Sequence, residues 1–205
     1  MSVAVAADGR LLASRNTEIV HSSRYLLRLV QDVLHESGLG LADLSGVVAL
    51  QGPGSFTGLR VGLATVYGFH QALGTRVAAL PTLRVIAECA GEETSDVVAV
   101  VDAHRGYWFH QAFRRGEDGT LEFSAPPHRT LAADLDTTPQ STIAGFGAAS
   151  LRDHLEQRPG VKLLEPPALA PIAAALASSW STWQASDLLA PLYLREPAVT
   201  PPPSP

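Results

Sequence analysis

Residues 51–70, QGPGSFTGLRVGLATVYGFH, decide how this chain folds. The short apolar run before them, 46–50, predicts a buried strand, and residues 57–73 form a nearly unbroken apolar run that predicts a helix. A turn rich in glycine and proline lies between the two. Thr57 is a candidate N-cap, because its hydroxyl can satisfy a free amide of the first helical turn. The stretch therefore predicts a strand, a tight turn and a helix.

The turn has the ingredients of an anion site, because a helix N-terminus after a glycine turn offers free backbone N–H groups. A P-loop requires lysine and then serine or threonine after its last glycine, whereas Leu59 and Arg60 stand there in this chain. The dinucleotide fingerprint fails as well, because its third glycine is due one residue earlier. Two interpretations of this segment therefore stay open: a loop that binds a nucleotide or another anion, and a purely structural turn. The candidate loop residues are Gly52, Gly54, Ser55, Thr57 and Gly58.

The predicted helix at 57–73 has two distinct faces. One face consists of small side chains spaced three or four positions apart, at Gly58, Gly62, Thr65, Gly68 and Ala72. A second face is apolar and carries Leu59, Leu63, Val66 and His70. A helix with so little polar surface is buried on most sides. We expect one side to cover a sheet and the small face to let another helix approach closely, in this chain or in another.

The rest of the chain predicts two halves, each combining strands with helices. Asp8-Gly9 between two short apolar runs predicts a β-hairpin at the start. The first half also predicts helices at 21–37 and 82–90, the second capped by Thr82, and a strand at 76–80. Beyond the polar stretch 91–95, the second half predicts a three-stranded meander at 97–101, 107–113 and 121–123. A loop-rich segment at 125–141 precedes a strand at 142–145, a helix at 148–155, a strand at 161–164, a helix at 171–183 and an extended tail at 191–195.

The composition of the chain limits the classes of protein to which it can belong. Hydrophobic residues make up 46% of the 205 residues and charged residues 17%, which is typical of a globular protein. The net charge of −5 gives no broad cationic field, so we do not expect the chain's own surface to be the main docking site for nucleic acid. No signal peptide and no uninterrupted apolar run near 18 residues is found. We therefore expect a cytoplasmic protein without a membrane contact.

Metal and thiol chemistry have little support in the sequence. The single cysteine, Cys89, excludes an internal disulfide and a multi-cysteine metal site, and its apolar neighbours predict a small core residue. No two of the 7 histidines are four positions apart, so no H-x-x-x-H pair can share a helix face. His35-Glu36 begins like a zinc-protease motif, but the second histidine is absent. We expect no metal.

Acid–base chemistry has one candidate cluster, formed by Asp102, His104 and Arg105. A solvated turn ending at Gly106 explains the same residues, and no nucleophile lies nearby in sequence. Ser55 does not have the glycine spacing of a G-x-S-x-G nucleophile elbow. His21, before the first predicted helix, is either functional or a local hydrogen-bonding residue. We predict no catalytic residue.

The motif GPGSFTGLRVG at 52–62 resembles the TsaB family, also called YeaZ. Further family-like segments follow the family order and extend over nearly the whole chain. They are His21-Ser22, Asp102-Ala103-x-Arg105-Gly106, Ala144-Gly145-x-Gly147 and Pro191-x-Tyr193-Leu194-Arg195. The resemblance implies an α/β, actin-like fold of the sugar-kinase and heat-shock ATPase class, with two lobes of mixed sheets and helices. We place the N-terminal lobe at 1–93, a smaller C-terminal lobe at 94–196, and a proline-rich tail, expected to be disordered, at 197–205.

One departure from the family concerns the start of the chain. The family begins with a strand that precedes the hairpin strand seen here at 2–6, so the first strand of the N-terminal lobe is missing. Its absence would leave unpaired backbone groups on its neighbours and an uncovered core, at a cost of several kcal/mol. We expect the true start codon to lie upstream of Met1; a truncated chain, or another element in the gap, would also explain the departure.

The resemblance also implies a function. TsaB proteins are non-catalytic partners of TsaD in making threonylcarbamoyladenosine in tRNA, next to the anticodon, which implies a scaffold role here. It implies a heterodimer with TsaD, TsaE as a further partner, a homodimer when alone, and tRNA contact only through the complex. No cofactor of its own is expected, although ATP or ADP could sit at the TsaD interface. The residues expected at that interface, on the helices at 22–37 and 57–73, are Leu26, Leu29, Val30, Val33, Gly62, Val66 and His70. The alternatives are a small-molecule kinase or ATPase of the same fold class and, least favoured, a metallopeptidase.

Overall fold

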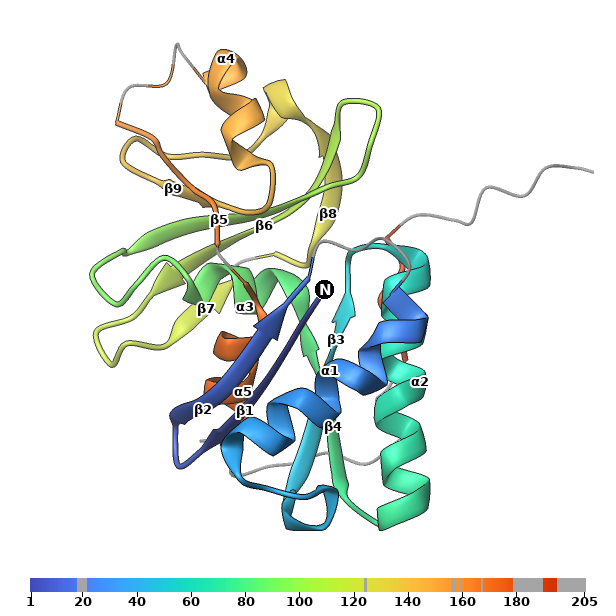
Figure 1. Cartoon of the computed structure of the whole chain (residues 1–205). Coiled ribbons are helices and arrows are strands. Elements are labelled where there is room, and N and C mark those ends of the chain that lie inside the picture. The colour runs from blue at the N-terminus through green and yellow to red at the C-terminus, as the bar shows by residue number, and fades with distance from the viewer. Residues whose placement is uncertain are drawn as a thin grey trace, which may run out of the picture.

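The computed structural model describes residues 1–17, 22–123, 125–155, 158, 160–166, 168–178 and 190–194 (Figure 1). His21, the predicted helix beyond 178, Arg195 and the proline-rich tail at 197–205 lie outside the described residues. The fold is α/β, as expected, with strands and helices in both halves of the chain.

The N-terminal half, residues 1–93, contains two separate pairs of strands. Strands β1 (Ser2–Ala7) and β2 (Arg10–Asn16) form the predicted antiparallel hairpin, and Asp8 and Gly9 turn with φ of 49° and 75°. Strands β3 (Gly46–Gly52) and β4 (Arg76–Pro81) pair in parallel. Among the described residues no strand joins β1 to β3, so the gap expected in this sheet is present.

Helices cover both strand pairs. Helix α1 (Ser22–Ser37) packs on the hairpin, and α2 (Phe56–Leu73), the crossover between β3 and β4, packs on that pair. The short turn η1 (Leu41–Asp43) follows α1, and α3 (Thr82–Glu88) follows β4. Helix α5 (Ala170–Ser178), which belongs to the C-terminal half by sequence, packs against β1, β2 and β3. The boundary near residue 94 stays a prediction.

The C-terminal half, residues 94–196, has one continuous sheet of six strands, in the upper part of Figure 1. Its centre is the predicted meander of β5 (Asp96–Asp102), β6 (Tyr107–Arg115) and β7 (Leu121–Phe123). Strand β9 (Thr142–Ala144) lies parallel between β5 and β10 (Lys162–Leu164). The turns η2 (Ala132–Asp134) and η3 (Ala148–Leu151) and the short helix α4 (Arg152–Leu155) complete this half. Strand β8 (His128–Leu131) pairs with β6 and lies in the segment predicted to be loop-rich, so that prediction was wrong there.

Two predicted helix caps are also wrong. The N-cap of α2 is Ser55, whose Oγ accepts a hydrogen bond from the Gly58 amide at 3.3 Å, and Thr57 is inside the helix. Serine serves at least as well as threonine at this position, and here it comes first in the chain. Thr82 does not cap α3, since it is the first residue inside the helix and Pro81 is at the N-cap; its Oγ1 instead accepts a hydrogen bond from the Gly52 amide at 3.2 Å. That bond ties the end of β3 to the start of α3.

The densest part of the core surrounds β5. Val97 and Ala99 belong to a cluster that includes helix α3, whereas Val98 and Val100 belong to a second cluster that includes Leu151. Successive residues of a strand point to opposite faces, so β5 is buried on both. Within the described residues no helix is long and apolar enough to cross a membrane.

Candidate functional site

The glycine turn after β3 is held by the chain's own C-terminal segment. Gly52 has φ of 110°, and a Cβ there would lie 2.7 Å from the carbonyl oxygen of Leu192. The Leu192 amide donates a hydrogen bond to the carbonyl of Gln51 at 2.6 Å. Only glycine accepts this angle together with so close an approach. The turn is therefore a docking point for residues 190–194.

The start of α2 already uses one of its free amides, because the Ser55 side chain accepts a hydrogen bond from the Gly58 amide. The bond from the Leu59 amide to the Ser55 carbonyl is the first regular bond of the helix. The serine cap favours the structural explanation of the turn. Gly54, Ser55, Thr57 and Gly58 are exposed, whereas Gly52 is buried. Nucleotide or anion binding by the loop stays a prediction.

An aromatic and cationic cluster joins α2 to the C-terminal segment. The Arg60 Nε donates to the Tyr193 hydroxyl at 3.1 Å, and the Arg60 guanidinium lies 3.9 Å from the Phe56 ring centroid. The Phe56 and Tyr193 rings are 5.0 Å apart. The sequence did not indicate this cluster, because Tyr193 lies 133 positions beyond Arg60 along the chain.

Helix α1 turns most of its predicted partner residues toward its own half. Val33 is 0% exposed and belongs to the core. Leu26 and Val30 line a cavity, and Leu29 is half-buried. The exposed large apolar residues of α1 are instead Tyr25 and Leu27.

Helix α2 likewise turns predicted partner residues toward its own half. Val66 is buried, Gly62 and Val66 line the cavity, and His70 Nδ1 lies 2.9 Å from the carbonyl oxygen of Thr75. The solvent-facing side carries small and uncharged residues around Tyr67, which is 48% exposed. Arg60 is the only charged residue in α2, and it is engaged by Phe56 and Tyr193.

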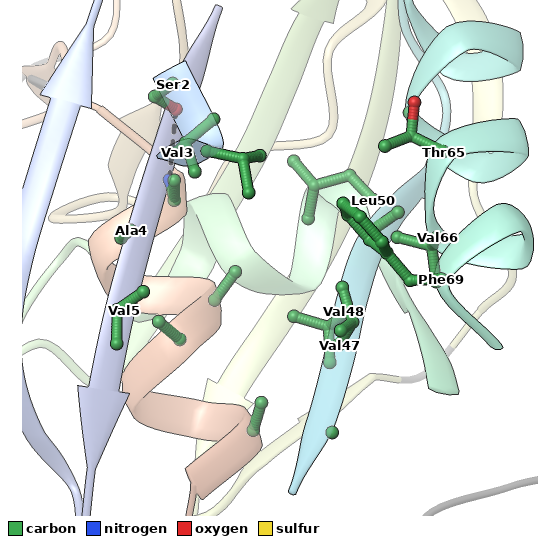
Figure 2. A pocket seen from close by; sticks show the side chains of 18 of the residues that line it. Ser2, Val3, Ala4, Val5, Val47, Val48, Leu50, Thr65, Val66 and Phe69 are labelled. Atoms are coloured by element: carbon green, nitrogen blue, oxygen red, sulfur yellow. Dashed lines mark hydrogen bonds between the residues drawn. The ribbon is translucent and has the colours of Figure 1, made fainter. Parts of the chain in front are cut away.

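A cavity of about 750 Å³ lies between the two strand pairs of the N-terminal half (Figure 2). Figure 2 shows Val3 and Val5 of β1 on one side of it, and Val48 and Leu50 of β3 on the other. Helices α1, α2 and α5 contribute the remaining walls. Most of the lining is aliphatic, so the cavity is an apolar space with strand backbone on two sides.

The polar cluster after β5 has the geometry of a solvated turn. The Asp102 Oδ1 accepts a hydrogen bond from the His104 amide at 2.7 Å, and the His104 ring is 3.5 Å from Oδ2 with its side chain 81% exposed. His104 and Arg105 both have φ near 60°, as the turn requires. In the part of the chain that the structure describes, no group of three or more His, Cys, Asp or Glu side chains could hold a metal ion.

Two titratable groups with shifted pKa values lie at the core: Cys89 is half-buried and packs against it, and His110 is buried. Burial raises the pKa of the Cys89 thiol to about 11, and the thiol donates to the Val85 carbonyl at 3.5 Å, as suits a core residue. His110 is 1% exposed, and its Nδ1 has no hydrogen-bond partner. Burial first, and the nearby His128 second, lower the pKa of His110 to about 4, against a smaller opposing effect of Asp136. The His110 and His128 ring centroids are 4.0 Å apart.

Comparison with known protein families finds a matching model described as TsaD, tRNA N6-adenosine threonylcarbamoyltransferase, over residues 16–134. That match covers more than half of the chain. An uncharacterized protein of Mycobacterium tuberculosis is 35% identical over 199 residues, which are 96% of this chain and 81% of the relative. The tRNA threonylcarbamoyladenosine biosynthesis protein TsaB of Escherichia coli is 31% identical over 120 residues. That alignment spans 58% of this chain and about half, 52%, of the E. coli protein.

Solved structures give the same fold. A Pseudomonas aeruginosa protein described as uncharacterized, with similarity to peptidase YEAZ, superposes with a TM-score of 0.80 at 24% identity. It covers 95% of this chain and 94% of its own. YeaZ from P. aeruginosa superposes with a TM-score of 0.76 at 22% identity, covering 94% of this chain and 93% of its own. These neighbours agree with the expected actin-like fold.

Proposed function

Because this chain belongs to the TsaD-like family and is a homologue of the TsaB (YeaZ) proteins, we propose that it serves tRNA threonylcarbamoyladenosine biosynthesis as a docking subunit. The role in that biosynthesis follows from the homologues. The finer proposal is that the chain itself does no chemistry and binds a catalytic TsaD subunit through helix α2.

The observation that supports docking is the uncharged outer side of α2. Its exposed residues include Ala64, Tyr67, Gly68 and Gln71, and the only charged residue, Arg60, is held by the aromatic cluster. A helix that faces only water normally carries charged residues on that side. Helix α1 follows this rule, with Arg28, Asp32, His35 and Glu36 exposed. Depletion of charge around an exposed tyrosine is typical of the centre of a protein interface.

A non-catalytic role has a separate support. The polar cluster singled out in the sequence for acid–base chemistry contains Asp102 and His104. In it, the Asp102 carboxylate accepts a hydrogen bond from the His104 amide of the same turn. The carboxylate of Asp102 therefore stabilises the turn, and its imidazole partner points into solvent. In the described part of the chain, no comparable arrangement supports the kinase or peptidase alternatives.

The test is binding of purified TsaD from the same organism to wild type and to Ala64→Arg. Arginine at the centre of an interface has to be desolvated, so we expect affinity to fall roughly tenfold or more. The matched control is Gln31→Arg, at a position on α1 that is also exposed, which we expect to bind within about twofold of wild type. Circular dichroism confirms that both variants are folded.

Each result has a defined meaning. Equal binding by both variants would place the contact away from α2. No binding of wild type to TsaD would overturn the heterodimer proposal, while sedimentation of the isolated chain would test the homodimer. Nucleotide at the shared surface and TsaE as a third partner are tested by titrating each into the TsaD complex and into each subunit alone.

A further inference from the structure

Helix α2, along the right-hand side of the molecule in Figure 1, carries one continuous exposed face. Its side chains recur at intervals of three or four positions, so they lie on the same side of the helix. They belong to Phe56, Arg60, Ala64, Tyr67 and Gln71, which together are called the outer face of α2. Arg60 is the only charged member of the outer face.

The Arg60 side chain is held from two directions. One flat side of its guanidinium lies 3.9 Å from the centroid of the Phe56 ring. Its Nε donates to the Tyr193 hydroxyl at 3.1 Å, and the neighbouring bond from the Leu192 amide to the Gln51 carbonyl fixes that segment. In the part of the chain that the structure describes, the Nη1 and Nη2 groups of Arg60 have no partner. Their N–H groups are therefore available, in a fixed plane, to an acceptor from outside the chain.

Other arginines of the chain have a carboxylate of their own. Arg84 pairs with Glu88 at 2.9 Å, and Arg114 pairs with Asp96 at 3.1 Å. Arg60 contacts a phenol and an aromatic ring instead, and neither neutralises its charge. A cation that a docked partner encloses without a counter-charge is costly. A partner on the outer face of α2 therefore has to bring an acidic group to Arg60.

We propose that the Arg60 guanidinium recognises a carboxylate of the TsaD subunit, from an aspartate or a glutamate, and that Tyr193 is the positioning residue that aims the guanidinium. The inference rests on the docking role proposed for α2 and names the chemistry that the partner brings to it. Because Nε is already used, the carboxylate approaches the end of the guanidinium and accepts from Nη1 and Nη2. A nucleic acid fits the outer face less well, because its affinity comes from many phosphate contacts and this face has a single cation.

A lysine at position 60 gives a chemical probe of that carboxylate. A carbodiimide joins a lysine amine to a carboxylate in direct contact, forming an amide with loss of water. Lys162, in β10, is the only lysine in the chain, so the background is low. The complex of Arg60→Lys with saturating purified TsaD from the same organism is treated, and mass spectrometry identifies the joined peptides. The matched control is Arg152→Lys, at an exposed position in the C-terminal half.

We expect the amine at position 60 to be joined to an aspartate or glutamate of TsaD, and the amine at position 152 and Lys162 to give at most a minor yield. Affinity measurements then separate charge from packing. Arg60→Met keeps a long apolar side chain and removes the charge, so affinity for TsaD should fall roughly tenfold or more. Circular dichroism confirms that each variant is folded.

The positioning role of Tyr193 has its own readout. Tyr193→Phe keeps the ring and removes the hydroxyl, so affinity should fall about threefold. In the Arg60→Met background the same change should have no further effect, because a residue that acts through Arg60 loses its role when the guanidinium is gone. An equal loss in both backgrounds would make Tyr193 a structural residue and contradict the positioning role.

The failure of this inference is distinguishable from that of the proposed docking role. Unchanged binding by Arg60→Met, while Ala64→Arg still weakens binding, would overturn the carboxylate contact and leave the docking role of α2 intact. Unchanged binding by both variants, or no binding of wild type to TsaD, would overturn both proposals. Equal cross-linking at positions 60 and 152, or at neither, would also overturn the carboxylate contact. So would an Arg60→Met protein that binds TsaD normally and tRNA more weakly, because the cation would then serve a phosphate.

Discussion

Strands β5 and β3 are both apolar and both lie between helices, yet they differ in burial. In β5, residues 97–100 are between 0% and 3% exposed, because β6 and β9 pair with its two edges. In β3, residues 46–50 are only half-buried, because one edge faces the cavity between the two strand pairs. Helices on both faces are therefore not enough to bury an apolar strand. Continuous pairing across the sheet is also needed, since it closes the edge and brings the covering helices into contact.

The largest effect that would test this comparison is expected at Gly145, where β9 ends against β5. A Cβ at Gly145 would clash with the backbone carbonyl and the side chain of Val100. Backbone cannot yield as a flexible side chain can, so we expect Gly145→Ala to lower the free energy of unfolding by about 3 kcal/mol. Urea denaturation followed by circular dichroism measures this change.

The matched control for Gly145→Ala is Gly68→Ala, because a Cβ at Gly68 meets no atom within 4 Å. We expect that control to be as stable as wild type or slightly more stable. If Gly145→Ala lost less than about 1 kcal/mol, β9 would not be packed as closely on β5 as the structure has it.

The second largest effect on the free energy of unfolding is expected at His110, in strand β6 of the closely packed C-terminal sheet. Its pKa is lowered from 6.5 to about 4 in the folded protein, so the unfolded chain takes up a proton first as the pH falls. The stability gained from the neutral, buried ring is complete above about pH 6.5 and is lost between about pH 6.5 and pH 4. We expect this loss to be on the order of 2 kcal/mol.

His110→Phe removes the titrating group, so its unfolding free energy should fall less than that of wild type between pH 7 and pH 4.5. Chemical denaturation at both pH values gives the comparison. His154→Gln, at an exposed position, is the control and should follow wild type. An identical pH dependence in wild type and His110→Phe would contradict the assignment to His110.

Local signals predicted most of the elements from the sequence. Asp8-Gly9 fixes the hairpin, the glycine turn separates β3 from α2, and the apolar run at 97–101 gives β5. Strand β8 was missed because its polar sequence, His128–Leu131, becomes a strand only by pairing with β6. Local patterns cannot report such a distant partner.

The candidate site was harder to predict for a related reason. Periodicity showed that α2 is apolar on most sides, but it could not say which side faces its own half. The structure turns Gly62 and Val66 inward and Tyr67 outward. The cluster of Arg60 with Tyr193 likewise depends on where the C-terminal segment crosses the glycine turn. These features are set by tertiary packing, which a single sequence shows only indirectly.

The smallest effect is expected in the open half, from Gly62→Leu compared with Gly68→Leu. Both changes replace glycine inside α2, so both should stabilise the protein by about 0.8 kcal/mol through helix propensity. Leucine at 62 also enters the cavity between the two strand pairs, where its contacts with the aliphatic walls should add about 1 kcal/mol relative to leucine at 68. Urea denaturation of the two variants side by side measures that difference. A Gly62→Leu protein less stable than Gly68→Leu would mean that this cavity is already filled in solution, and the contrast between the closed edges of β5 and the open edge of β3 would then disappear.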